Sequence, residues 1–192
     1  GIRVIVHARA VGAAYAARML GTLGAAVTWV EPPEGTPIRR EPPFVGDEVS
    51  ALFAYLAAGM ESRVIDLATD DGRGAFDALL TGADVLFDDT PVAVREALGL
   101  DEGGIAARHP HLIHVSLLPF GAYGPKADWQ GEDVVIQHAG GEGNLLPNGL
   151  AVEMFPDRPP LKIAGHFGAM QGGVAAALSA LTALWARGAD GM

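Results

Sequence analysis

The segment RVIVHARAVGAAYAARMLGTLGAAVTWVE, residues 3–31, decides the fold. Its first five residues, Arg3–His7, form a β-branched run that is typical of a buried strand. An alanine-rich helix is expected from about Ala13 to Leu23, and Val27–Glu31 gives the next strand. Strand, helix and strand in this order form the unit of a parallel sheet with a right-handed crossover. Only Gly12 lies in the first turn, so the glycine fingerprint of a dinucleotide-binding loop is absent.

Similar signals extend this sheet along the chain. Further strands are expected over Arg63–Leu67, Val85–Asp88 and Leu112–Ser116. Helices are expected over residues 50–58, 70–80, 91–98 and 105–108, with Ser50 as the cap of the first. The predicted fold class is therefore α/β, a Rossmann-like parallel sheet with helices on both faces.

The bulk composition suits one sizeable domain. The chain has 192 residues, of which 49% are hydrophobic, so a large core is available. Zero cysteines exclude disulfides, cysteine-ligated zinc and thiol catalysis, and they are compatible with a cytoplasmic location. No run approaches the length of a membrane span, so we expect no membrane association. A net charge of −10 argues against a nucleic-acid partner. Any anionic ligand then needs a few local cations or backbone N–H groups.

Two loops separate the regular elements. Residues 31–48 form a long proline-rich loop whose only cations are Arg39 and Arg40. Such a pair could clamp a phosphate or could simply be solvated, and both interpretations stay open. Residues 119–133 form a second loop rich in glycine, proline and aromatic residues, and residues 140–160 are irregular, as in a hairpin or lid.

Three histidines, His109, His111 and His114, cluster in sequence. They fall in a loop and a strand without a carboxylate or fourth ligand at metal-binding spacing. We therefore expect no metal site.

The stretch KIAGHFGAMQGG, residues 162–173, opens the last helix, expected from about Met170 to Arg187. Its glycines permit a sharp turn and close packing. His166 stands in that turn, and the free N–H groups of a helix start suit an anion or a polarised carbonyl. A purely local histidine at a glycine-rich helix entry is the simpler alternative.

The order of these motifs resembles the class III CoA-transferases, a family that includes formyl-CoA transferase, carnitine CoA-transferase and alpha-methylacyl-CoA racemase. The matching segments run along nearly the whole chain: residues 3–7, 21–27, 30–35 with Arg39, 65–67, 71–73, 82–86, 98–100, 109–113, 120–121, 124–125, 131–133, 165–168 and 177–187. No single motif is decisive, but this many in one order is specific.

The resemblance implies a large domain that binds CoA on a Rossmann-type sheet. Residues 1–192 would be the N-terminal portion of that domain, without the small domain and the C-terminal return. The chain would then be a piece of a longer protein or one half of a tandem protein. The resemblance also implies interlocked subunits, so we expect a homodimer or a partner half-domain.

The implied catalytic residues are His166, Glu132 and Asp133. In the transferases the place matching His166 is an aspartate that attacks the acyl-CoA thioester, and an imidazole cannot do this in the same way. In the racemase an aspartate there works with a histidine at the place matching Glu132. Here the acid and the imidazole are exchanged, and such a pair could still supply one base and one acid.

The implied cofactor is coenzyme A, as the acyl-CoA substrate, with Arg39, Gly165, Gly168 and Lys126 as its contacts. Several other CoA-contacting residues of the family are replaced in this sequence. A basic stretch of the family reads Ala57–Glu61 here, an Asn-Phe pair is replaced by Asp89-Thr90, and an arginine by Ala97. Each lost charge-assisted bond costs about 1.5–3 kcal/mol, so CoA binding is expected to be weakened.

Three functions follow from this sequence. The first is transfer of CoA between carboxylic acids through an acyl-CoA thioester. The second is a catalytically degenerate structural or regulatory half of a tandem protein. The third is movement of an alpha proton of an acyl-CoA by His166 and Glu132.

Overall fold

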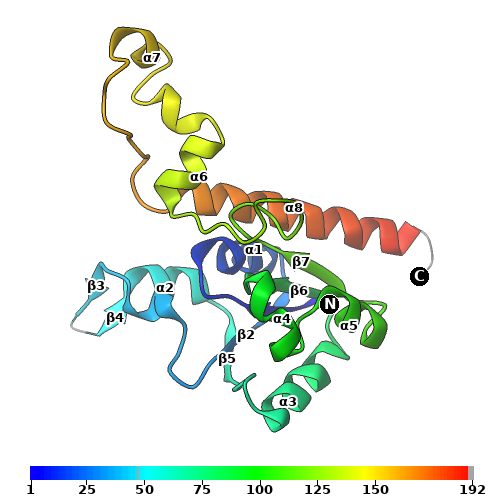
Figure 1. The fold of residues 1–192 in the computed structure, drawn as a ribbon. Helices are drawn as coiled ribbons and strands as arrows, with labels where there is room; N and C mark the ends of the chain where they lie inside the picture. Colours follow the sequence, from blue (N-terminus) through cyan, green and yellow to red (C-terminus); the bar gives the residue numbers. More distant parts are fainter. Residues whose placement is uncertain (47, 190–192) are drawn as a thin grey trace.

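A parallel sheet of five strands forms the centre of the computed structural model, which describes residues 1–46 and 48–189 (Figure 1). The strands are β1 (Arg3–His7), β2 (Ala26–Glu31), β5 (Glu61–Val64), β6 (Val85–Asp88) and β7 (Ile113–Ser116), in the spatial order β5-β2-β1-β6-β7. Val4 of β1 lies opposite Val27 of β2 and Val85 of β6. The predicted α/β class with a Rossmann-like sheet is confirmed.

Helices connect the strands. They are α1 (Val11–Thr22), α2 (Ala51–Ala57), α3 (Asp70–Leu80), α4 (Val92–Leu98), α5 (Glu102–Arg108), α6 (Asp133–Ala139), α7 (Ala151–Met154) and α8 (Phe167–Ala189). Two 3₁₀ turns, η1 (Pro37–Arg40) and η2 (Glu142–Leu145), and a small antiparallel pair, β3 (Phe44–Val45) with β4 (Val49–Ser50), complete the described chain. Beyond α6, the segment that carries α7 extends away from the sheet (Figure 1).

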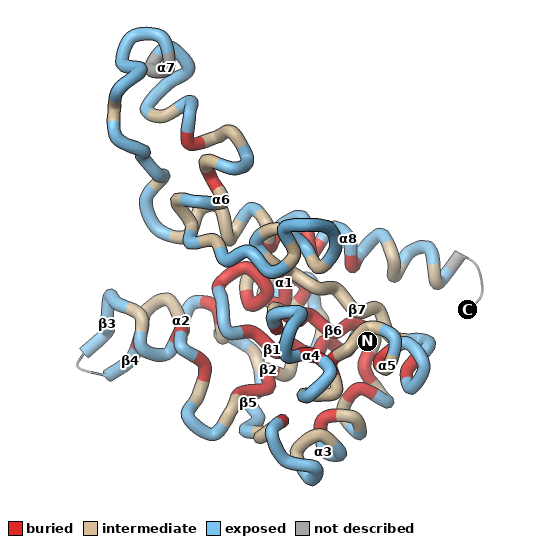
Figure 2. The backbone as a smooth tube through the Cα atoms, in the orientation of Figure 1, coloured by how far each residue is buried: buried red, intermediate tan, exposed pale blue. Residues whose placement is uncertain are grey.

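Both faces of the sheet are buried, because successive strand residues point to opposite sides. On one face Val4 and Phe87 pack in a cluster that includes alanines of α1 and α8. On the other face Ile5 and Leu86 pack with residues of α3 and α5, among them Phe76. Figure 2 shows the buried residues gathered at the strands and α1, whereas the segment around α7 is mostly exposed.

Several element boundaries differ from the sequence expectation. The strand expected over residues 63–67 is β5 at Glu61–Val64, because Thr28–Glu31 of β2 sets the register of that pairing. The 31–48 loop contains η1 and β3, and residues 140–160 form η2 and α7 instead of a hairpin. The last helix begins at Phe167, three residues before Met170, because Asp133 accepts a hydrogen bond from the backbone N–H of Ala169 at 3.1 Å.

One described helix corrects the expectation that no run is as long as a membrane span. Residues 167–188 of α8 are long and apolar enough to cross a membrane, judged by length and composition alone. A helix of a globular core passes the same test, so one such helix is a weak indication of a membrane span.

Two glycines let α8 pack closely on α1. A Cβ at Gly173 of α8 would lie 2.6 Å from the carbonyl oxygen of Gly12. A Cβ at Gly12 of α1 would lie 2.7 Å from Leu117 and 2.9 Å from the carbonyl oxygen of Ala169. Backbone atoms cannot move aside as a flexible side chain can, so the contact between the helices requires glycine at both positions.

We expect the substitution Gly173→Ala to lower the free energy of unfolding by about 1–3 kcal/mol, because the added methyl group meets backbone atoms of α1. Gly74→Ala in α3 is the matched control, since a Cβ there meets nothing within 4 Å. This control should stabilise the protein by up to about 1 kcal/mol through helix propensity. Chemical denaturation measures both values, and equal stability of the two variants would contradict the close contact.

Candidate functional site

The sheet reverses its winding between β1 and β6. From β1 the chain proceeds to β2 and β5 on one side, and it then returns to β6 and β7 on the other. In open α/β sheets, ligands bind in the crevice outside the carboxyl ends of the strands at such a switch point. In this chain that edge carries residues 8–10, after β1, and residues 89–90, after β6.

A cavity of about 560 Å³ opens at this edge. Its wall consists of residues from the start of α1, the loop after β7, α6, η2 and the first turns of α8: Ala10, Gly12, Ala13, Asp89, Leu117, Leu118, Pro119, Gly131, Ile136, Gln137, Gly140, Glu142, Gly168, Ala169, Gln171, Gly172 and Ala175. Among these described wall residues, the charged ones are Asp89 and Glu142, and none is a lysine, arginine or histidine. The volume lies within the range of small-molecule sites.

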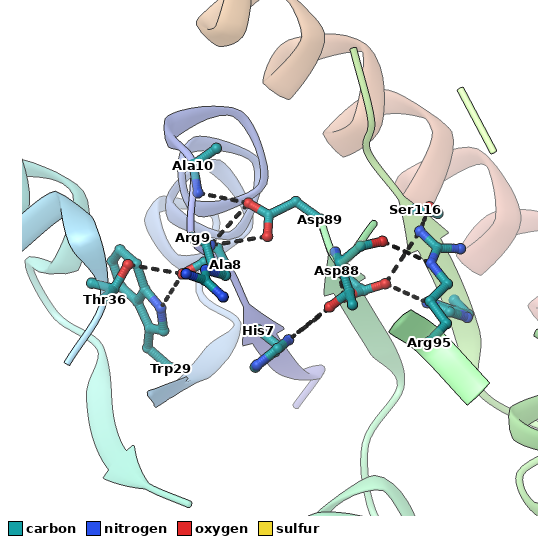
Figure 3. Close-up of polar contacts among 12 residues, drawn as sticks. His7, Ala8, Arg9, Ala10, Trp29, Thr36, Asp88, Asp89, Arg95 and Ser116 are labelled. Carbon is teal, nitrogen blue, oxygen red and sulfur yellow. Dashed lines mark hydrogen bonds and ion pairs between the residues drawn. The ribbon is translucent and has the colours of Figure 1, made fainter. Parts of the chain in front are cut away.

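Asp89 is held against the start of α1 (Figure 3). Its Oδ2 accepts hydrogen bonds from the backbone N–H groups of Ala10 at 2.7 Å and Arg9 at 3.0 Å. Its Oδ1 accepts from Arg9 at 2.9 Å. Burial raises the pKa of the Asp89 carboxyl to about 6, and the charge of neighbouring Asp88 adds to this rise while the N–H groups oppose it. Asp89 is thus a wall residue whose charge changes near neutral pH.

Asp88 points to the other side of the sheet and is fully buried (Figure 3). Its carboxylate lies 3.4 Å from Nη2 of Arg95, 3.6 Å from Nδ1 of His7 and 3.6 Å from Nε2 of His114. It also accepts a hydrogen bond from the N–H of Thr90 at 2.9 Å. Burial alone would raise the pKa of Asp88, but the polar groups of His114, His7 and Thr90 outweigh it and hold the pKa well below its usual range.

Asp133 fixes the start of α8 against α6. Its Oδ1 accepts the N–H of Ala169 at 3.1 Å, and its Oδ2 accepts a hydrogen bond from the side chain of Gln137. Nζ of Lys162 lies 3.8 Å from the same carboxylate. A Cβ at Gly168 would lie 3.1 Å from Oδ1 of Asp133, so glycine keeps this approach open. Asp133 therefore positions the helix end that lines the cavity.

His166 lies directly before α8, outside the residues that line the cavity. Its Nε2 is 3.1 Å from Oε2 of Glu41 in the loop after η1. The turn before it needs Gly165, whose φ is +72°. Glu132 precedes α6 without a side-chain capping bond, and no described contact joins its side chain to His166.

Arg39 forms a bidentate ion pair with a buried carboxylate. Its Nε and Nη2 donate to Glu31 at 2.6 and 2.7 Å, and its guanidinium stacks over the ring of Phe53. Glu31 also accepts from Ser62 at 2.6 Å and from the N–H of Thr36 at 3.1 Å. Burial opposes the charge of Glu31, but these donors hold its pKa below the ordinary value.

Lys126 lies apart from the cavity at the switch point. Its Nζ is 4.9 Å from the centre of the Trp129 ring, a cation–π contact. Both residues line a second, shallower cavity of about 680 Å³, together with Phe120, Val134, Val135 and Pro160 among others.

The positions at which this sequence departs from the family's CoA contacts lie in different surroundings. Met60 packs against the core cluster under α1, whereas Glu61 is exposed and forms an ion pair with Arg63 at 2.8 Å. Ala97 is exposed on α4. Among the replaced positions, Asp89 is the one that lines the cavity at the switch point.

Two of the three histidines of the sequence cluster have carboxylate partners. Nε2 of His109 lies 2.8 Å from Asp77, and His114 faces Asp88. Among the described residues, no group of three histidine or acidic side chains is arranged to hold a metal ion.

The sequence identified Asp89 only as a departure from a family pattern, and it did not identify Arg95. A usable signal was the second acid after a buried strand, because that position lies at the edge of a parallel sheet. For Arg95, a cation in the helix that follows the same strand gave no comparable signal.

Comparison with known proteins places this geometry in a family. The CoA-transferase family III profile matches residues 1–192. The acetyl-CoA:oxalate CoA-transferase of Acetobacter aceti is 31% identical over 189 residues, which cover 97% of this chain and 46% of that protein. The succinate–glutarate CoA-transferase of Agrobacterium fabrum is 34% identical over 169 residues, covering 84% and 40%.

A solved structure agrees with the fold. A CAIB/BAIF family protein from Brucella suis superposes with a TM-score of 0.88 at 32% identity, covering 100% of this chain and 50% of that one. The chain spans about half the length of the relatives that it matches. It belongs to CoA-transferase family III.

Proposed function

We propose that the protein transfers CoA between carboxylic acids and that this chain supplies the cavity for the acyl thioester. The observation that carries the proposal is the 560 Å³ cavity at the switch point, closed by the glycine-rich start of α8. In the reaction, the thioester C–S bond of the donor breaks, a new C–S bond forms at the carboxyl carbon of the acceptor, and one oxygen of the acceptor carboxylate ends on the donor acyl group, which leaves as a carboxylate. No oxidation or net hydrolysis is involved, so the enzyme must exclude water and hold two acyl groups in turn.

Within this proposal His166 is the candidate catalytic group, with Glu132 as its acid–base counterpart. Asp133 positions the start of α8 beside them. Gly165 and Gly168 let the backbone approach the ligand, and Lys126 and Arg39 meet its anionic groups. We place the protein in the cytoplasm, as the cysteine-free sequence suggests.

A non-catalytic half is the second candidate. It is favoured by the pairing of His166 with Glu41 outside the cavity, and by a described cavity wall without any cation. Under this proposal a partner half carries the catalytic carboxylate. Alpha-proton transfer by His166 and Glu132 is the third candidate, and it requires substrate between two side chains that no described contact joins.

We also propose that a second copy or a partner half covers α8. Val174, Leu178, Leu181 and Trp185 are all exposed at helical spacing, with Trp185 82% exposed. These residues form a continuous apolar stripe, and stripes of this kind are usually covered.

Exchange of labelled acetate into acetyl-CoA tests the three candidates together. CoA transfer predicts that label enters the thioester. Alpha-proton transfer predicts instead that solvent deuterium enters the acetyl methyl group, and a non-catalytic half predicts neither.

The substitution His166→Ala should abolish exchange and leave the affinity for acetyl-CoA within about twofold, since the imidazole acts in the chemical step. His111→Ala, at an exposed histidine, is the control, and it should keep both the exchange activity and the affinity for acetyl-CoA. Exchange that survives His166→Ala would remove His166 from the mechanism.

Replacing Arg39 separates its two proposed roles. Arg39→Ala leaves a buried carboxylate unpaired, so the free energy of unfolding should fall by about 1–3 kcal/mol, discounted because the guanidinium is 42% exposed. This loss should shrink as the pH falls below the ordinary pKa of a glutamate, because protonation of Glu31 removes the ion pair in the parent protein and the unpaired charge in the variant. Acetyl-CoA affinity should fall about tenfold if Arg39 also holds a phosphate. The control Arg40→Ala should change the free energy of unfolding and the affinity for acetyl-CoA only slightly. If Arg39→Ala leaves the affinity unchanged, the role of Arg39 is purely structural.

Substitution in the α8 stripe tests the partner surface. Leu178→Glu places a charge in the stripe and should convert a dimer into a monomer, because a buried unpaired charge costs several kcal/mol. The control is Ser179→Glu, at an exposed α8 residue on another face of the helix. Light scattering after size-exclusion chromatography measures the mass, and a monomeric parent protein would contradict self-association.

A further inference from the structure

The wall of the cavity at the switch point is apolar apart from four side chains. Glycine, alanine, leucine, isoleucine and proline form most of it, and the polar members are Asp89, Gln137, Glu142 and Gln171. Two of these four are carboxylic acids, and Glu142 lies 3.3 Å from the side-chain amide of Gln171. The described wall therefore presents hydrocarbon and negative charge to whatever enters.

Two N–H groups directly before α1 are already occupied by a carboxylate of the chain. A helix start commonly attracts an anion. Here both Arg9 and Ala10 already donate their N–H groups to Asp89 at 2.7–3.0 Å. The carboxylate of the chain thus occupies the place that an anionic ligand group would take.

Most of the nearby cations pair with other acids, and Arg9, which is exposed, does not line the cavity. On the β1 side His7 faces Asp88, and on the α4 side Arg95 pairs with Asp88 at 3.4 Å and Glu102 at 3.1 Å. From α6, Asp133 adds a further acid, whose nearest cation is Lys162. From β7 His114 also faces Asp88, and α8 contributes no charged residue to the described wall. An acyl group with a free carboxylate would meet no compensating charge in this wall.

We propose that the cavity accepts an uncharged acyl chain, and that Asp89 is the specificity-determining residue that rejects an acyl group carrying a second carboxylate. This inference rests on the proposed acyl-CoA function and names the class of acyl group for that site. The preferred substrates are thioesters of monocarboxylic acids, and thioesters of dicarboxylic acids are excluded by like-charge repulsion in a poorly solvated space.

The rejection depends on pH. Burial raises the pKa of Asp89 to about 6, so the carboxylate is ionised at about pH 7.5 and mostly protonated at about pH 5. Protonation removes the repulsive charge. Discrimination against a dicarboxylic acyl group therefore weakens as the pH falls through 6.

The substitution Asp89→Asn changes the charge with little change of shape. Placed at the position of Oδ2, the amide oxygen can accept the N–H groups of both Arg9 and Ala10, as Oδ2 does now. The NH₂ group then takes the place of Oδ1 and gives up the hydrogen bond that Oδ1 accepts from Arg9 at 2.9 Å, so the N–H of Arg9 keeps the amide oxygen as its acceptor. Asp70→Asn is the matched control, because it alters the net charge equally at a side chain that is 97% exposed at the start of α3.

Butyryl-CoA and succinyl-CoA are the probes, since they share CoA and a four-carbon acyl chain and differ in the terminal carboxylate. At about pH 7.5 we expect the parent protein and Asp70→Asn to bind butyryl-CoA at least about tenfold more tightly than succinyl-CoA in calorimetric titration. In Asp89→Asn this ratio should approach 1. In the parent it should also approach 1 near pH 5, and in Asp89→Asn it should not change with pH.

The corresponding pantetheine thioesters separate this inference from the proposed function, because they lack the phosphates of CoA. If ligand-observed NMR shows the same preference and its loss in Asp89→Asn with pantetheine thioesters, while CoA thioesters do not bind, the cavity inference stands and the CoA function fails. Equal affinity for the two acyl groups in the parent protein overturns the inference and leaves the CoA function intact. Absence of binding of all four thioesters to both proteins overturns both.

Discussion

The close contact between α1 and α8 is the constraint on which the rest of the site depends. Gly12 and Gly173 remove the side chains that would hold the two helices apart. Because α1 begins at the carboxyl end of β1, a helix packed closely against it places its own start beside the same edge of the sheet. Asp133 then completes the arrangement by binding the N–H of Ala169. The cavity exists because two helix starts and one sheet edge meet there, and the backbone contact between the glycines determines how closely they meet.

Much of the fold could be predicted from the sequence, since it rests on local signals. The β-branched runs gave β1, β6 and β7 to within a residue, and the cap at Ser50 was found as expected. The boundaries that failed were set by distant partners. The register of β5 follows its pairing with β2, and the early start of α8 follows a carboxylate 36 positions away at Asp133. Neither contact leaves a periodic pattern in its own segment, so neither could be predicted from that segment alone.

The candidate site was less predictable, for a related reason. His166 and Arg39 were chosen because a titratable group in a glycine turn and a cation in an acidic chain stand out in a sequence. In the folded chain each has a nearby acid, Glu41 for His166 and Glu31 for Arg39. Composition reveals that charges are scarce, but it does not show which of them are already paired. The interpretation of Arg39 as a phosphate clamp therefore competes with a structural ion pair.

Asp88 and Asp89 show how one strand end can hold two acids whose pKa values are shifted in opposite directions. Phe87 packs with the α1 and α8 side of the sheet and Leu86 with the other side. Since side chains alternate along a strand, Asp88 points to the same side of the sheet as Leu86, and Asp89 points to the same side as Phe87. Asp88 thereby reaches Arg95, His7 and His114, which keep it ionised, whereas Asp89 reaches only backbone N–H groups and an apolar cavity. The buried charge of Asp88 also raises the pKa of Asp89. The cavity whose described wall carries no lysine, arginine or histidine lies on the same side of the sheet as Asp89, so the alternation that builds the core also sets the charge of that wall.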